Sequence, residues 1–120
     1  MIVVDSAIWI DHFHHRIDRL ADLMALRAAL LHPFALGELA LGSLRGRDRI
    51  LIAARDLPVP PIADSDEVLG LIQSASLSGT GIGYVDAHLL ASALLAPNGK
   101  LWTRDKRLAA AATRLGVAFG

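Results

Sequence analysis

MIVVDSAIWID, residues 1–11, decides the fold of this chain. Ile2–Val4 is a run of three β-branched residues, which is typical of a short buried strand. Asp5 follows directly and can cap a helix that carries Ile8 and Trp9. A strand that leads into a helix begins an α/β unit, and here it places a carboxylate at the carboxyl end of the strand.

The rest of the chain alternates helical patterns with short apolar segments. Apolar spacing predicts helices over residues 17–31, 35–44, 47–56, 64–77, 84–96 and 105–115. Residues 100–103 and 117–119 are expected strands, whereas residues 57–62 contain three prolines and are expected to form a turn. This order predicts an α/β fold with a mostly parallel central sheet.

Composition narrows the class of protein. A length of 120 residues predicts a single domain spanning 1–120, and 53% hydrophobic residues with a mean hydropathy of +0.44 exclude disorder. The absence of cysteine excludes disulfides, thiolate metal sites and a cysteine nucleophile. We expect a cytoplasmic protein, because the sequence shows no signal peptide and no membrane span. A net charge of +0 argues against coating nucleic acid by bulk charge.

Three carboxylates stand alone within apolar segments: Asp5, Glu38 and Asp86. Burial of an unpaired carboxylate is costly, so a partner is expected to offset it. Asp105 lies two residues after the strand that carries Leu101-Trp102-Thr103. Because functional groups of open α/β sheets gather at the carboxyl ends of strands, we expect the four acids to converge.

Four converging carboxylates repel one another, and a hard divalent cation such as Mg²⁺ or Mn²⁺ is their natural partner. Such a site activates water and stabilises the charge of a phosphodiester transition state. Ser6 and Thr103 flank the acids and can orient them. Helix capping alone would also explain the three aspartates, but it does not explain Glu38.

Four blocks, in this order, resemble the PIN-domain ribonucleases and in particular the VapC-type toxins: MIVVDSAIWID, FALGELALGSL, GIGYVDAHLLASALL and LWTRDKRL. The resemblance implies a three-layer α/β/α fold with about five short strands. It also implies Mg²⁺- or Mn²⁺-dependent endoribonuclease activity on tRNA or an rRNA loop. Asp5, Glu38, Asp86 and Asp105 would then be the catalytic, metal-binding set, with Ser6 and Thr103 in support. The resemblance further implies that the chain forms a homodimer and binds a VapB-type antitoxin.

Two basic stretches are either solvated helix faces or contacts to RNA phosphates. One contains Arg45, Arg47, Arg49 and Arg55, and the other contains Lys100, Arg104, Lys106 and Arg107. Arg104 and Arg107 are the preferred substrate-binding candidates, because they neighbour Asp105 in the sequence. Without the four site acids, the chain has eight acidic and twelve basic residues. This balance suits an acidic metal pocket surrounded by a mildly basic surface.

Several other features have ordinary structural explanations. His12, His14 and His15 are interpreted as an exposed helix end, although Asp11 and His15 have a spacing that permits metal binding. Trp9 and Trp102 are expected in the core, and His88 is expected to be structural or peripheral. An apolar surplus around the first two helices suggests either ordinary core or a groove for an antitoxin helix; it comprises Leu20, Leu23, Met24 and Leu30.

Two other classes of function fit the sequence less well than a nuclease. A non-catalytic PIN-like module that binds RNA or protein is the alternative, but such a module has no need of four converging acids. A haloacid-dehalogenase-type phosphatase requires a second aspartate at position 7, where this chain has Ala7. A receiver domain requires an aspartate at the end of a middle strand, and none is expected there.

Overall fold

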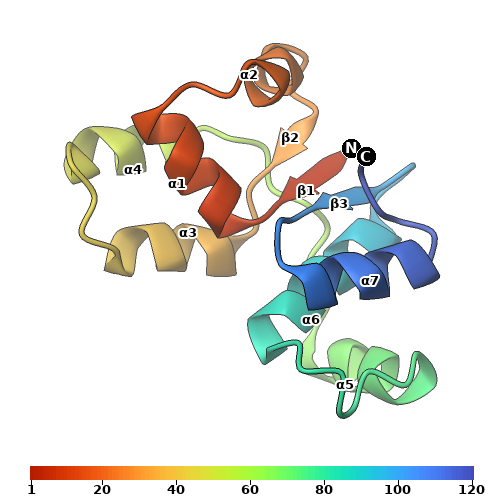
Figure 1. Ribbon diagram of the computed structural model, residues 1–120. Coiled ribbons are helices and arrows are strands. Elements are labelled where there is room, and N and C mark those ends of the chain that lie inside the picture. Colours follow the sequence, from red (N-terminus) through yellow and green to blue (C-terminus); the bar gives the residue numbers. More distant parts are fainter.

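A computed structural model describes residues 1–120 as a three-stranded parallel sheet with seven helices (Figure 1). The strand order is β2-β1-β3, so the first strand of the sequence is central. The strands are β1 (Ile2–Val4), β2 (Ala29–Leu30) and β3 (Lys100–Trp102). The helices are α1 (Ser6–His14), α2 (Asp18–Ala25), α3 (Pro33–Leu41), α4 (Arg47–Arg55), α5 (Ser65–Ser74), α6 (Tyr84–Leu95) and α7 (Lys106–Arg114). None of these helices has the length and apolar character needed to cross a bilayer.

Alternation along β1 divides the interior into two cores. Val3 faces a cluster that contains Leu101 of β3 and apolar residues of α6 and α7. Ile2 and Val4 face the opposite cluster, to which α1, α2, α3 and α4 contribute. Successive strand residues point to opposite faces, so each face of the sheet has its own helical layer and the fold is α/β/α. Figure 1 shows α1 to α4 gathered on one side and α5 to α7 on the other.

Register brings the ends of β1 and β3 together. Val4 of β1 pairs with Trp102 of β3, and the Asp5 N–H donates to the Trp102 carbonyl at 2.9 Å. The chain therefore leaves both strands at the same edge of the sheet, with α1 starting after one strand and α7 after the other. This shared carboxyl edge positions the acidic side chains described below.

The expectation of about five strands is wrong, because the sheet has three. Residues 117–119, expected as a strand, contribute only a bridge between Ala118 and Leu101. Residues 57–62 make one backbone bond toward the sheet, from the Leu31 N–H to the Pro58 carbonyl, and form no strand. Three prolines in this segment remove the donors that a ladder needs.

The helix expected over residues 17–31 is also wrong in its second half. The helix ends at Ala25, and Arg27 adopts a left-handed conformation with φ +51°. Ala29–Leu30 then forms β2, both residues being buried against β1. A short apolar run has the same composition in a buried strand as in a buried helix, so periodicity could not separate them.

Candidate active site at the carboxyl edge of the sheet

Thr103 links the two acids that follow β1 and β3. Its hydroxyl Oγ1 donates to Asp5 Oδ2 at 2.7 Å, and the Asp105 N–H donates back to the same Oγ1 at 3.1 Å. Asp5 and Asp105 are a hundred residues apart in sequence and are held here by one hydroxyl group. The structure thus brings these two carboxylates to one edge of the sheet.

Each of the three aspartates also organises local backbone. Asp5 Oδ1 accepts from the Ser6 N–H at 2.8 Å, and Asp86 Oδ2 accepts from the Gly83 N–H at 3.1 Å. Asp105 Oδ1 caps α7 by accepting from the first-turn N–H groups of Arg107 and Leu108, at 2.9 and 3.0 Å. Asp86 and Asp105 each retain one carboxylate oxygen without a protein partner. Capping and ligand binding are therefore compatible at these positions.

Electrostatics couple Glu38 and Asp86 to the other acids. Burial raises the pKa of Glu38; the Ser6 hydroxyl opposes the shift, and the charges of Asp5 and Asp86 add to it. Burial also raises the pKa of Asp86; the bond from the Gly83 N–H opposes the shift, and the charges of Asp5 and Asp105 add to it. The charges of Asp5 and Asp86 thus act on Glu38, and those of Asp5 and Asp105 act on Asp86.

The acids line an open edge instead of a sealed pocket. Asp5 and Asp86 are half-buried, whereas Glu38 and Asp105 are exposed. Burial among apolar segments, expected from the sequence, is therefore only partial. An open edge lets an extended polymer reach the carboxylates.

The donor set fits a hard divalent cation by its chemistry, because carboxylate and hydroxyl oxygens are the ligands that Mg²⁺ and Mn²⁺ prefer. As the side chains stand, no three His, Asp or Glu residues are close enough together to hold one ion.

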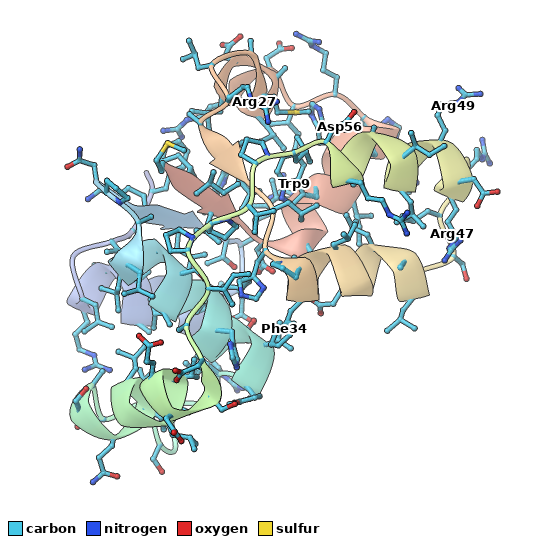
Figure 2. The ribbon with its side chains drawn as sticks, turned by 180° about the vertical axis from the view of Figure 1, so that it is seen from behind. Trp9, Arg27, Phe34, Arg47, Arg49 and Asp56 are labelled. Atoms are coloured by element: carbon cyan, nitrogen blue, oxygen red, sulfur yellow. The ribbon has the colours of Figure 1, made fainter.

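An aromatic and histidine cluster beside the acids was not expected from the sequence. The ring of His88 lies edge-on to Phe34 and Tyr84, with centroid separations of 4.7 and 4.6 Å, and 6.1 Å from His32. Phe34, labelled in Figure 2, precedes Glu38 by one turn of α3, and Tyr84 opens the helix that carries Asp86. The only sequence signal was His32-Pro33, which is typical of a helix start.

His32 is neutral in this cluster. Its Nδ1 accepts from the Phe34 N–H at 2.9 Å, and the residue is fully buried. Burial, with a smaller contribution from His88, lowers the pKa of His32 to about 4. His32 Nε2, His88 Nδ1 and Ser92 Oγ are buried without a hydrogen-bond partner. His88 is buried, in agreement with the expected structural role.

The two arginines favoured as substrate contacts have different surroundings. Arg104 forms an ion pair with Asp11 of α1 and so connects the start of α7 to another layer. Arg107 forms no ion pair, and its guanidinium lies against Gly81 in the loop before α6. These surroundings separate two residues that the sequence could not distinguish.

The remaining side features mostly follow the structural expectations. Trp9 is fully buried between α1, α3 and α4 (Figure 2), while Trp102 is half-buried and packs on Phe119. His14 and His15 are exposed as expected, but His12 is half-buried and its Nδ1 accepts from the Ile17 N–H at 3.0 Å. Of the residues suggested for an antitoxin groove, Leu20 and Leu30 are buried core residues on opposite faces of the sheet.

Fold and site together define an α/β protein with a carboxylate-based site at the carboxyl edge of a parallel sheet. No family model and no solved structure matches the chain. It is 45% identical over 119 residues to Ribonuclease VapC32 of Mycobacterium tuberculosis, in both strain CDC 1551 and strain H37Rv. The alignment covers 99% of this chain and 96% of each relative. The chain therefore belongs to the VapC ribonuclease family.

Proposed function

We propose that this chain is the endoribonuclease toxin of a toxin–antitoxin system. The observation that carries the proposal is the coupling of Asp5, Glu38, Asp86 and Asp105 at one open edge of the sheet. Family membership supports the same conclusion, because the relatives are named ribonucleases of the VapC type. The substrate class is RNA, and a loop of tRNA or rRNA is the specific target that we propose.

Asp5, Glu38, Asp86 and Asp105 would hold Mg²⁺ or Mn²⁺, with Ser6 and Thr103 orienting them. When bound, the cation supplies positive charge at the scissile phosphate and lowers the pKa of a water molecule. Thr103 fixes the Asp5 carboxylate through the 2.7 Å bond to Oδ2 and so keeps it at the edge. The backbone caps on Asp86 and Asp105 leave one oxygen of each carboxylate available.

One carboxylate is also proposed to accept the proton of the attacking water. An acid with a raised pKa is the better base, because its proton affinity is closer to the working pH. Burial and like charge raise the pKa of both Asp86 and Glu38. Either residue therefore meets the electrostatic requirement, and Asp86 in addition has its position fixed by the Gly83 N–H.

Protein partners are part of the proposal as well. Large apolar side chains are exposed on several helices: Leu41, Ile52, Leu69, Leu94 and Leu95. Exposed apolar surface favours protein contacts, so it supports both a homodimer and an antitoxin that covers the toxin. We place this assembly in the cytoplasm, where the RNA substrates are.

Cleavage of RNA by the purified chain tests the proposal. In the presence of Mn²⁺, Asp5→Asn and Asp86→Asn should each lower the rate by about 100-fold or more, as expected for loss of a group that stabilises transition-state charge. Asp66→Asn is the matched control, because Asp66 is an exposed acid of α5 outside the site. Unchanged cleavage by both site variants would overturn the assignment. RNA binding without any cleavage by the parent chain would support a non-catalytic module instead.

A further inference from the structure

α7 and the glycine-rich loop before α6 enclose a surface cavity that the proposed chemistry does not use. Its volume is about 500 Å³, which is in the range of small-ligand sites. The lining consists of Thr80, Lys106, Arg107, Ala110, Ala111 and Arg114. Three of these side chains are cationic and none is acidic, so the cavity is chemically suited to an anion.

The positive charge of this cavity is not neutralised within the chain. The ion pairs of the structure join Arg16 to Asp18, Arg47 to Asp48, and Arg104 to Asp11. Lys106, Arg107 and Arg114 take part in none of them. Arg114 Nη1 donates to the Ala75 carbonyl at 2.7 Å, which fixes the side chain but leaves its charge uncompensated. Unpaired cations in a concave surface concentrate the field that attracts anions.

The absence of a side chain at Gly81 leaves room for the Arg107 side chain over the loop. A Cβ atom at residue 81 would lie 2.8 Å from both Cδ and Nη1 of Arg107, and Gly81 has φ +88°. A side chain at this position would displace the guanidinium and strain the backbone. Glycine thus allows Arg107 to rest directly on the loop that leads into α6.

The cavity shares both of its walls with the acidic edge. Asp105 directly precedes Lys106 and caps the helix that forms one wall. Thr80, the one lining residue outside α7, belongs to the loop that ends at Gly83, whose N–H donates to Asp86. One extended strand can therefore contact the carboxylates and the cationic cavity at the same time. A free small anion would occupy the cavity alone and would not contact the carboxylates.

We propose that this cavity binds a backbone phosphate of the RNA strand, next to the phosphate that is cleaved. The inference rests on the proposed ribonuclease function and adds a specific contact to it. Lys and Arg contacts to phosphate fix the register of a nucleic acid without reading its sequence. Arg107 and Lys106 carry this role, whereas Arg104 is already paired with Asp11.

Salt dependence of RNA binding tests the assignment. Binding of a labelled single-stranded oligonucleotide is measured in EDTA over a range of KCl concentrations, so that metal-dependent cleavage cannot occur. For single strands the slope of log K against log salt is negative, and each lost phosphate contact makes it less negative by about 0.7. The double variant Lys106→Gln/Arg107→Gln should therefore make the slope less negative by about 0.7, as expected for one lost phosphate, and weaken binding at low salt.

A matched control removes the same charge elsewhere. Arg19→Gln/Arg27→Gln deletes two exposed arginines, one in α2 and one just after it, that form no ion pair and lie outside both basic stretches. This control should keep the parent slope. Equal slopes for both double variants, or a parent slope in the Lys106/Arg107 variant, would overturn the proposal.

Competition with ATP distinguishes a strand contact from a site for free nucleotides. Binding of ATP that depends on Lys106 and Arg107, with RNA binding unchanged in the double variant, would also overturn the assignment. Cleavage by the parent chain is measured separately with Mn²⁺. A chain that cleaves RNA but shows no change in slope disproves only the cavity contact, and a chain that does not cleave disproves the proposed function.

Discussion

The two faces of the sheet are apolar and buried, whereas its carboxyl edge is acidic and partly exposed. The faces are covered by apolar clusters in which Val3, Leu89 and Leu101 on one side, and Val4 and Trp9 on the other, are excluded from solvent. The edge gathers four carboxylates whose mutual repulsion and partial burial raise the pKa of two of them. The apolar faces therefore favour folding, whereas the ionised acids at the edge oppose it.

This difference predicts that substitutions in the two regions change the free energy of unfolding in opposite directions. A change on a face should lower stability, whereas neutralising an acid at the edge should raise it and remove activity. The following experiments are ordered from the largest expected effect to the smallest.

Leu89→Ala on α6 should cause the largest loss of stability. Leu89 is fully buried in the core between the sheet, α6 and α7. Truncating a buried leucine loses transfer free energy and leaves a cavity, at a cost of about 2–5 kcal/mol. Urea denaturation measures the change, and Leu94→Ala on the exposed side of the same helix is the control. Equal stabilities for the two variants would contradict the assignment of this face as core.

His32 should make stability depend on pH. The folded pKa is about 4 against an ordinary value of 6.5, so the unfolded chain binds more protons between these values. Stability should therefore fall as the pH falls through this window, with a slope of at most about 1.4 kcal/mol per pH unit for one proton. His32→Asn keeps an acceptor for the Phe34 N–H and should flatten the slope. A variant that retains the parent slope would show that another group is responsible.

Thr103→Val should weaken the link between the two strand ends. The substitution removes the donor to Asp5 Oδ2 and the acceptor of the Asp105 N–H. Loss of a hydrogen bond to a charged group is expected to cost about 1.5–3 kcal/mol. Thr113→Val on α7, whose hydroxyl bonds only the Ala109 carbonyl, should cost much less. Thermal unfolding compares the two variants, and a larger effect at Thr113 would refute the bridging role.

Asp86→Asn and Glu38→Gln should give the smallest changes in stability, and both should raise the unfolding temperature. A carboxyl group whose folded pKa is raised destabilises the fold when it is ionised, so its amide analogue should unfold at a higher temperature near neutral pH. Asn at position 86 still offers an acceptor to the Gly83 N–H. A lower unfolding temperature for both variants would mean that the edge contributes to stability after all.

Sequence patterns predicted the parts of the fold that have local causes. The strand at residues 2–4, its capped helix, and the helices that start near residues 47, 84 and 106 follow from apolar spacing and caps. The meeting of Asp5 with Asp105 followed from the rule that parallel strands end at one edge. β2 was missed because two apolar residues carry no periodicity, and the number of strands was set too high by the family resemblance.

Contacts between distant segments account for what the sequence could not show. The ion pair of Arg104 with Asp11, and the packing of Arg107 on Gly81, depend on how α1, α7 and the glycine-rich loop are placed. The neutral state of His32 depends on its burial beside His88, which lies more than fifty positions away. No spacing rule connects such residues before the fold is known.

Thermal unfolding with and without Mn²⁺ tests the central claim, that the carboxyl edge is an unfavourable cluster of charge built to receive a cation. Mn²⁺ should raise the unfolding temperature of the parent chain, because an ion at 100 times its dissociation constant stabilises the folded state by about 2.7 kcal/mol. The same concentration should stabilise Asp86→Asn much less, so that the parent becomes the more stable of the two. An equal response of both proteins, or no response of the parent chain, would contradict the account.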